Sequence, residues 1–485
     1  MKTLTYRNIN NSDERVNFET ALLRGMGSNY GLYMIDKQDL PKFSTEQLDS
    51  MGRMSYAQTA LTVLAPFLEA EIPRNKLENI LEDAYDESKI KTEMDYVKEY
   101  IHIMWLTNGP TYSFKDYAAR FFGRTLNHFL GERGLKRTVL VATSGDTGGA
   151  VADALCGLDN VNNIVFYPRG SISQGQRRQM TTLGKNIYAF EVNGDFDICQ
   201  ALAKTLLGEK ELAKQVFKDE NHFTSANSIS LGRLLPQTVY PFYAYSRMDA
   251  DRKPIIASVP SGNFGDMMGT VLAKAMGLPI ARIICGVNEN DEFPRFMQTG
   301  KYNVRPTVSS PSSAMNVSHP SNLARLIDFY GGHMFDERDP KTNKVTREGV
   351  IDKMPDLDSM RRDLWSVSIK NDMHYDTMKK VFEKVKVILD PHGAVGWRAL
   401  ECYHQSGEHL MPSVIYETAD PGKFPDDIKT AIGFRPATPT GIKKQAQLSE
   451  RVYTIQSNPE KTPSGLKLNS EQVEEAKTKI REIFS

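Results

Sequence analysis

The chain has 485 residues, of which 40% are hydrophobic, so it can bury a substantial core spread over two or three domains. Sixty basic and sixty acidic side chains cancel without forming a basic run, which argues against nucleic-acid binding and against attachment to an anionic membrane. The four cysteines form no Cys-x-x-Cys pair, and no apolar run resembles a signal peptide or a membrane span. We therefore expect a globular protein of the reducing cytoplasm without a metal site.

The first hundred residues carry helical patterns separated by turn signals, including one long helix expected from Thr45 to about Leu68. After Val139, short apolar runs alternate with helical stretches. The predicted strands are 138–142, 163–167, 187–192, 255–259, 280–287 and 413–417. The predicted helices are 148–155, 195–207, 265–276 and 394–404. This alternation predicts an α/β fold with mainly parallel sheets, in which ligands bind at the carboxyl ends of the strands.

We expect three parts along the chain. Residues 1–100 form a mainly helical N-terminal domain, and residues 101–250 form a smaller α/β domain. Residues 251–485 form a larger α/β domain, with a helical insertion near 300–385 and a C-terminal extension. That extension closes with an amphipathic helix at 472–484.

A lysine between aromatic residues lies in the stretch 109–120. Lys115 is flanked by Phe114 and Tyr117, and an apolar wall disfavours the ammonium and frees an amine that can form a Schiff base. A lysine that packs its stem on aromatic rings and points its charge to water explains the same residues. This stretch alone does not separate the two interpretations.

Two predicted strands end in glycine-rich turns that open a helix. The first turn is 142–149 (ATSGDTGG) and the second is 260–266 (PSGNFGD). Backbone N–H groups at the positive end of a helix make each turn a candidate anion site. Neither has the lysine of a P-loop or the spacing of a dinucleotide fingerprint, and each alone is equally explained as a tight connection that needs glycine. Two in one chain suit ligands with two anionic groups, such as a cofactor phosphate and a substrate carboxylate.

In chain order, these motifs resemble the threonine synthase family, whose members are pyridoxal-phosphate enzymes of the tryptophan-synthase-β-like fold (fold type II). The motifs that carry the resemblance are Gly109-Pro110-Thr111, Phe114-Lys115-Asp116, 142–148, 167–170, 183–184, 194–197, 225–229, 258–266, 288–296, 390–395 and Thr418-Ala419. The resemblance covers nearly the whole chain. It implies two parallel-sheet α/β domains with the active site in the cleft between them.

The resemblance also implies roles for individual residues. Lys115 is the implied catalytic residue and carries pyridoxal 5'-phosphate as a Schiff base. The other implied cofactor-binding residues are Gly262, Asn263, Phe264, Asp266 and Thr418. The implied substrate-binding residues are Ser144, Asp146, Thr147, Arg177, Asn227 and Ser228. Three of these residues have ordinary explanations as well: Asp266 as a helix-dipole partner, Thr418 as a turn cap and Arg177 as part of a solvated face.

The activity that the resemblance implies is the conversion of O-phospho-L-homoserine and water to L-threonine and phosphate, the last step of threonine biosynthesis. The chain departs from the family pattern at Asn108, where many relatives have histidine, and at Asp420 in the late motif. These departures leave open a phospho-lyase that releases 2-oxobutyrate and a dehydratase of serine or threonine. Lys115 counts against a non-catalytic relative. We expect a monomer or small homo-oligomer with a small-molecule substrate.

Overall fold

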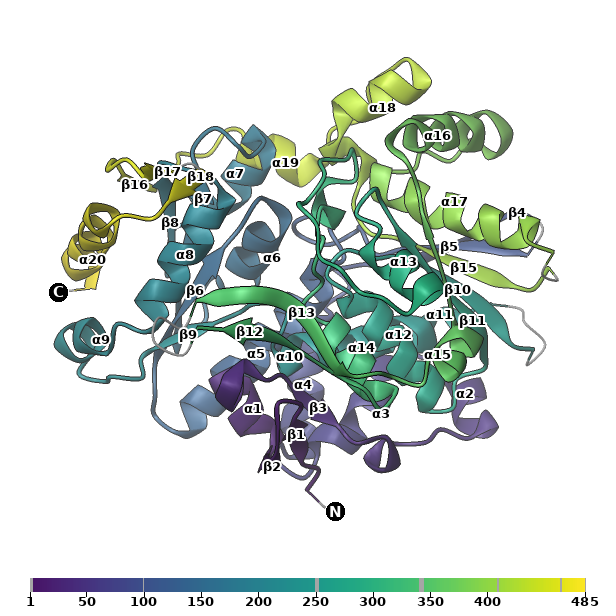
Figure 1. The fold of residues 1–485 in the computed structure, drawn as a ribbon, viewed down its shortest axis with the longest axis horizontal. Helices are drawn as coiled ribbons and strands as arrows, with labels where there is room; N and C mark the ends of the chain where they lie inside the picture. The colour runs from purple at the N-terminus through teal and green to yellow at the C-terminus, as the bar shows by residue number, and fades with distance from the viewer. Residues whose placement is uncertain are drawn as a thin grey trace. The chain divides into compact units, whose positions relative to one another are not determined.

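The computed structural model describes residues 3–98, 100–248, 253–339, 344–407, 410–462 and 465–484 (Figure 1). It divides into two compact units, neither of which is continuous in sequence. Unit 1 consists of Met1–Leu22, Met26–Phe114 and Ser228–Ala437, and unit 2 of Leu23–Gly25, Lys115–Asn227 and Thr438–Ser485. The domain limits expected at residues 100 and 250 do not coincide with these units. The second of these limits falls in 249–252, outside the described residues.

Unit 1 contains a six-stranded sheet in the order β14-β11-β10-β15-β5-β4. Its strands are β4 (Glu93–Lys98), β5 (Ile101–Trp105), β10 (Ile255–Pro260), β11 (Ile280–Val287), β14 (Leu364–Ser368) and β15 (Ser413–Glu417). All neighbouring strands are parallel except β4 and β5. Every residue of β10 and β15 is buried, which is typical of central strands in a parallel sheet.

Helices of unit 1, α17 above all, bury apolar side chains against this sheet. Its helices are α2 (Thr45–Met51), α3 (Tyr56–Leu68), α4 (Arg74–Ala84), α10 (Leu231–Leu234), α11 (Val239–Tyr245), α12 (Gly265–Ala275), α13 (Glu292–Thr299), α14 (Leu323–Phe329), α15 (Leu357–Asp363), α16 (Asn371–Val385), α17 (Pro391–Gln405) and α18 (Pro425–Ile432). Ile256, Ile284 and Ile415 from three strands form one core cluster with Trp397 and Leu400 of α17. This core fixes the carboxyl ends of β10 and β15 side by side.

Unit 2 contains a five-stranded, fully parallel sheet in the order β16-β8-β7-β6-β9. Its strands are β6 (Arg137–Ala142), β7 (Val161–Pro168), β8 (Ile187–Val192), β9 (Phe223–Ser225) and β16 (Val452–Ile455). Its helices are α5 (Lys115–Glu132), α6 (Asp146–Leu155), α7 (Gln174–Thr181), α8 (Phe196–Leu207), α9 (Lys210–Phe217), α19 (Thr440–Gln445) and α20 (Ser470–Phe484). A short hairpin, β17 (Glu460–Thr462) with β18 (Gly465–Lys467), precedes α20.

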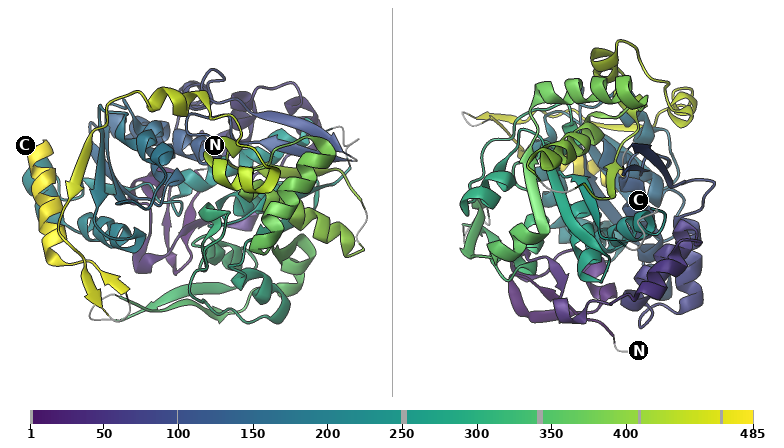
Figure 2. Two further views of the ribbon diagram at one scale, coloured as in Figure 1. Left: turned by 90° about the horizontal axis from the view of Figure 1, so that it is seen from above. Right: turned by 90° about the vertical axis from the view of Figure 1, so that its right-hand side faces the viewer.

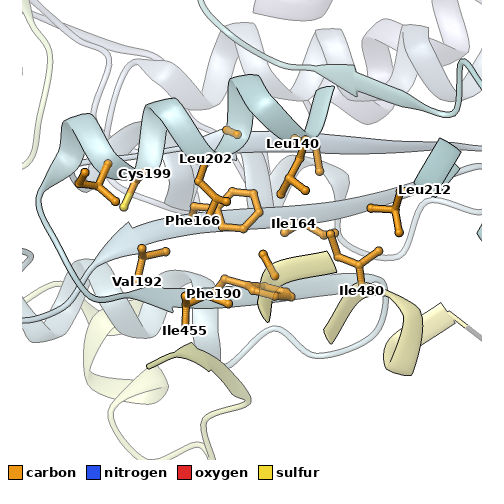
Figure 3. Close-up of a cluster of buried hydrophobic side chains, with 14 residues drawn as sticks. Leu140, Ile164, Phe166, Phe190, Val192, Cys199, Leu202, Leu212, Ile455 and Ile480 are labelled. Carbon is orange, nitrogen blue, oxygen red and sulfur yellow. The ribbon is translucent and has the colours of Figure 1, made fainter. Parts of the chain in front are cut away.

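The end of the chain completes the core of unit 2. Ile455 of β16 and Ile480 of α20 are buried in one cluster with Leu140, Phe166 and Phe190 of the sheet (Figure 3). Figure 2 shows α20, in yellow, beside this sheet. The C-terminal extension, expected as part of the larger domain 251–485, therefore packs in unit 2, which contains Lys115.

The α/β class, the parallel sheets and every predicted strand and helix after residue 137 are confirmed, with ends that shift by a few residues. The single helix expected from Thr45 to Leu68 is wrong, because two helices, α2 and α3, occupy this stretch. Gly52 follows the end of α2, and a capping box then starts α3. In that box, Ser55 Oγ accepts from Gln58 N at 3.2 Å and Gln58 Oε1 accepts from Ser55 N at 2.9 Å.

Strands were missed in two regions predicted to be helical. The N-terminal region contains α1 (Phe18–Arg24) and an antiparallel sheet of β1 (Tyr6–Asn8), β2 (Asn11–Val16) and β3 (Tyr33–Ile35). The region 300–385 contains β14 and an antiparallel ribbon of β12 (His333–Arg338) and β13 (Val345–Lys353) besides α14 to α16. β2 and β13 are mostly polar, so they lack the alternation that identifies a half-buried strand.

No helix in the described part of the chain is long and apolar enough to cross a membrane. Within the same residues, no group of three or more His, Cys, Asp or Glu side chains is placed to hold a metal ion.

Candidate functional site

Lys115 is the first residue of α5 and of the Lys115–Asn227 segment of unit 2. Its side chain is only 15% exposed, and its Nζ lies 3.9 Å from Asp146 Oδ2. Asp146 starts α6, and its Oδ1 accepts a hydrogen bond from Gln176 Nε2 at 2.9 Å. The structure thus brings together the predicted catalytic lysine and one predicted substrate residue, and it adds Gln176, to which the sequence assigned no role.

The turn 143–149, which joins β6 to α6, is held closed by its own threonine. Thr143 Oγ1 accepts from the N–H groups of Gly145 and Gly148, each at 2.9 Å. A Cβ on Gly148 would lie 2.3 Å from Thr143 Cγ2, so this close packing requires glycine. The N–H groups of Ser144 and Thr147 donate to no oxygen of the described residues. Their N–H and hydroxyl groups can therefore receive an anionic group beside Lys115.

Two other predicted substrate residues of unit 2 have different surroundings. Arg177, on α7, is 36% exposed and its Nη2 pairs with Glu450 Oε1 at 2.6 Å, with Glu191 Oε1 3.9 Å from Nη1. Asn227 is exposed at the end of the Lys115–Asn227 segment, and its N–H donates to Ser225 Oγ at 3.3 Å. Arg177 is thus already engaged by carboxylates.

The turn 261–266 in unit 1 joins β10 to α12. Its residue Phe264 has φ of 61°, a left-handed conformation that is uncommon outside glycine. The N–H groups of Gly262, Asn263, Phe264 and Gly265 donate to no oxygen of the described residues. Four successive donors at the N-terminus of a helix form a cradle for an anion, and a phosphate group fits it.

The side chains of this turn contact neighbouring residues that support its conformation. Asn263 Nδ2 donates to Ser228 Oγ, and Asn263 Oδ1 accepts from Ser321 N at 2.6 Å. The buried ring of Phe264 meets Phe293 edge-on, with centroids 5.0 Å apart, so Phe264 offers its backbone rather than its ring. Asp266 is buried, and its Oδ1 accepts from the adjacent Met267 N.

Gly262 is required by close packing as well as by access to a ligand. A Cβ at this position would lie 2.9 Å from Ala314 O and 3.0 Å from Met315 Cα. The segment 313–315 is in turn attached to α17, because Ala314 N donates to His392 Nε2 at 3.1 Å. The cradle therefore has a fixed wall on this side.

Thr418 follows β15, the strand next to β10, so it lies at the same edge of the sheet as the 261–266 turn. Thr418 is buried, and its carbonyl oxygen accepts from Phe114 N at 2.9 Å. Phe114 immediately precedes Lys115, and Ser113 pairs with Ala419 in an isolated bridge. The backbone that leads into Lys115 is thus attached to Thr418.

A buried acid network lies behind Thr418. Glu417 Oε1 accepts from Asp390 N at 2.7 Å, and Asp390 Oδ2 lies 2.5 Å from His392 Nδ1. Because His392 Nε2 accepts from a backbone N–H, the ring proton is on Nδ1. Burial raises the pKa of Glu417 well above its usual range, and the charge of Asp390 adds to this effect. Glu417 therefore keeps its proton to a higher pH than an ordinary glutamate.

The two departures from the family pattern also have structural partners. Asn108 Nδ2 donates to Glu93 Oε2 at 2.9 Å, which ties the end of β5 to the start of β4. Asp420 Oδ1 accepts from Gly422 N at 2.7 Å and caps the short turn Pro421–Lys423. Burial raises the pKa of Asp420.

The sequence did not identify four residues that support these turns: Gln176, His392, Asn322 and Arg325. Ser173-x-x-Gln176 is a capping-box pattern, which could have indicated the position of Gln176. His392 lies in a motif that carried the resemblance, without an assigned role. Asn322 and Arg325 had no signal, because an arginine in an apolar helical pattern is ordinarily a solvent-facing residue.

In comparisons with known proteins, the chain matches three family patterns that follow one another along its length. The family described as "Pyridoxal-phosphate dependent enzyme" matches residues 101–414. The patterns described as "Threonine synthase N terminus" and "Threonine synthase, C-terminal" match residues 5–85 and 393–463.

Individual relatives and solved structures agree with these matches. The chain is 33% identical to a threonine synthase of Serratia marcescens over 449 residues, which covers 92% of this chain and 95% of the relative. It is 30% identical to a threonine synthase of Schizosaccharomyces pombe, with 88% and 89% covered. A crystal structure of pyridoxal-phosphate-bound threonine synthase from Brucella melitensis superposes with a TM-score of 0.87 at 29% identity, covering 99% of this chain and 100% of that one.

Proposed function

The chain belongs to the threonine synthase family of pyridoxal-phosphate-dependent enzymes, and we propose that it converts O-phospho-L-homoserine and water to L-threonine and phosphate. It is a lyase that acts on a small-molecule substrate. The reaction removes phosphate from the γ-carbon of the substrate and adds water at the β-carbon, and it completes threonine biosynthesis.

The observation that carries this proposal is the cradle of four N–H groups at 262–265. It suits the phosphate of pyridoxal phosphate, because the donors are successive and the helix α12 adds its positive end. We assign Gly262, Asn263 and Phe264 to this phosphate through their backbone. Asp266 acts less directly, since a carboxylate next to a phosphate needs a donor between the two groups.

Thr418 is proposed to meet the ring nitrogen of the cofactor. Its position at the carboxyl edge of the sheet, one strand from the cradle, supports this assignment. When bound, pyridoxal phosphate supplies an electron-poor ring that stabilises negative charge beside the α-carbon of an attached amino acid.

Lys115 is proposed to hold the cofactor and then to move protons. Its amine takes the proton from the substrate α-carbon and returns it at the end of the reaction. Asp146, 3.9 Å away, keeps the side chain directed to the 143–149 turn, and Gln176 prevents that carboxylate from turning away. A mostly buried, directed amine is suited to this exchange because little reorganisation precedes each transfer.

The substrate anions are proposed to bind residues of the turn 143–149 and of the segment 225–229. Ser144 and Thr147 offer N–H and hydroxyl donors, and Asn227 is exposed. Ser228 Oγ is held by Asn263, so it couples this segment to the cofactor cradle. Arg177 becomes a substrate ligand only by exchanging Glu450 for the substrate.

Product analysis tests the proposed reaction. Purified protein loaded with pyridoxal phosphate is supplied with O-phospho-L-homoserine, and threonine, 2-oxobutyrate and phosphate are quantified together. We expect threonine and phosphate in equal amounts. Release of 2-oxobutyrate equal to phosphate would contradict the proposal and assign a phospho-lyase activity.

A further inference from the structure

Arg325 is a fully buried cation in unit 1 whose hydrogen bonds all go to neutral oxygens. It lies in α14, and its side chain is 0% exposed. Its Nε donates to Tyr33 O at 3.0 Å, Nη1 to Asn322 Oδ1 at 2.7 Å and Nη2 to Ile229 O at 2.6 Å. The guanidinium thus joins three segments that are distant in sequence.

The charge of Arg325 has no paired anion. Among the described residues, no carboxylate lies within ion-pair distance of its guanidinium. The charge of Asp328 acts to raise the pKa of Arg325, but Asp328 is itself paired with Arg7 Nη2 at 2.9 Å. Burial lowers the pKa of Arg325 to about 9. A buried, unpaired cation is a net cost to the fold unless an anion binds near it.

Arg325 is connected to the 261–266 turn through the side chain of Asn322. Because Asn322 Oδ1 accepts from Arg325, the Nδ2 of Asn322 faces the turn, where it donates to Asn263 O at 2.9 Å. This bond fixes the peptide before Phe264, the residue in the left-handed conformation. Arg325 also holds Ile229 O, next to Ser228, whose hydroxyl accepts from Asn263 Nδ2.

We propose that Arg325 is a positioning residue for the anion cradle: its charge and its hydrogen bond to Asn322 prepare the 261–266 turn for a phosphate monoester. This inference rests on the proposed function, because it takes the cofactor phosphate as the ligand of the cradle. The bound dianion supplies the negative charge that the protein does not place beside Arg325. The cost of burying the guanidinium is then recovered when the cofactor binds.

The preference for phosphate is the property to measure. The full chain is stripped of cofactor and titrated with pyridoxal 5'-phosphate and with pyridoxal, which lacks the phosphate, and the ratio of the two dissociation constants is compared among variants. In Arg325→Met, we expect affinity for pyridoxal phosphate to fall by about tenfold or more while affinity for pyridoxal changes little. An equal loss for both ligands, or no loss, would overturn the inference.

A second variant tests the charge in a protein that keeps Arg325 and its contact with residue 322. Asn322→Asp gives Arg325 a carboxylate partner of nearly the same shape, so the buried cation becomes an ion pair and the fold is expected to remain stable. It also removes the donor to Asn263 O. We expect the preference for pyridoxal phosphate to fall by about tenfold here as well. A folded variant with an unchanged preference would overturn the inference.

The control is Arg247→Met, which removes a half-buried arginine of unit 1 that also donates to backbone carbonyls, those of Met51 and Met54. Its contacts do not reach the turn, so its preference should equal that of the wild type. The wild type itself separates the two proposals. If the wild type binds pyridoxal as tightly as pyridoxal phosphate, the proposed function fails. If the wild type prefers pyridoxal phosphate and the Arg325 and Asn322 variants prefer it equally, only the role of Arg325 fails.

Discussion

The 261–266 turn of unit 1 and the 143–149 turn of unit 2 share a strand–turn–helix architecture but differ in what holds them. The first is fixed from outside, by Ser321 and Asn322, with a buried cation behind Asn322. The second closes on its own Thr143. It also carries Asp146, which faces Lys115. Residues far away in sequence therefore support the turn that suits a phosphate, whereas the turn that faces the amine is held by its own residues.

The largest effect is expected at Lys115, whose amine lies near Asp146 of the second turn. Lys115→Ala removes the amine that exchanges protons with substrate, so turnover should fall by about 10³-fold. The phosphate cradle is unaltered, so the variant should still bind pyridoxal phosphate reversibly. Turnover and cofactor titration measure the two effects. Wild-type turnover would remove Lys115 from its role, and Lys136→Ala, at an exposed lysine of unit 2, is the control.

Acid should destabilise unit 2 through its buried histidine. His222 stacks on Phe217, with centroids 3.6 Å apart, and Nε2 lies 3.0 Å from Thr138 Oγ1. Burial, with the nearby charge of Arg137, lowers the pKa of His222 to about 4. A depressed histidine pKa stabilises the fold fully above the unfolded value of about 6.5, and this contribution is lost as the pH falls toward 4.

Between pH 6.5 and 4.5, the wild type should therefore lose about 2 to 3 kcal/mol more of its free energy of unfolding than His222→Gln does. Denaturant unfolding at the two pH values measures this difference. Glu417 of unit 1 affects stability in the opposite direction: its raised pKa keeps it protonated in acid, so its contribution to the free energy of unfolding is lost as the pH rises rather than as it falls. An equal acid sensitivity in the wild type and His222→Gln would remove this contrast between the units.

A smaller effect is expected from adding a methyl group at Gly262 of the first turn. Gly262→Ala places a Cβ within 2.9 Å of Ala314 O, so the turn or its neighbour must shift. Affinity for pyridoxal phosphate should then fall by about tenfold, which corresponds to about 1.4 kcal/mol. Gly175→Ala is the matched control, because its Cβ would meet Ile442 Cγ2 at an ordinary 3.6 Å. Unchanged cofactor affinity in Gly262→Ala would contradict the cradle assignment.

The smallest effect is expected at Thr418. Thr418→Val keeps the shape of the side chain and the backbone bond to Phe114, but it removes the hydroxyl proposed to meet the ring. The absorbance spectrum of the bound cofactor should shift, while its affinity changes by no more than about threefold. The same spectrum in wild type and variant would show that Thr418 does not contact the ring. Thr430→Val, at an exposed position, controls for the substitution itself.

The strands that carry the two turns could be predicted because they are buried along most of their length. β6 and β10 show this pattern as short apolar runs bounded by turns. β2 and β13 could not, since their pairing depends on neighbours rather than on an apolar face. The break at Gly52 was missed because the apolar pattern continues on both sides of it.

The turns themselves were visible as glycine-rich segments after strands, but their supports were not. Asn322 is 59 residues from Asn263 in sequence, and nothing local indicates that they meet. Arg325 has the residue type of a surface position, and only the tertiary structure buries it. The residues that support the two turns therefore had to be identified from the structure, whereas the glycine spacing and Lys115 were accessible from the sequence.

The most direct test of the account is to find the residue that carries the cofactor. Protein loaded with pyridoxal phosphate is reduced with borohydride, digested and mapped by mass spectrometry. We predict that the reduced cofactor is attached to Lys115 and that Lys115→Ala gives no labelled peptide. Attachment to another lysine in the wild type would contradict the assignment of Lys115 and of the site built around it.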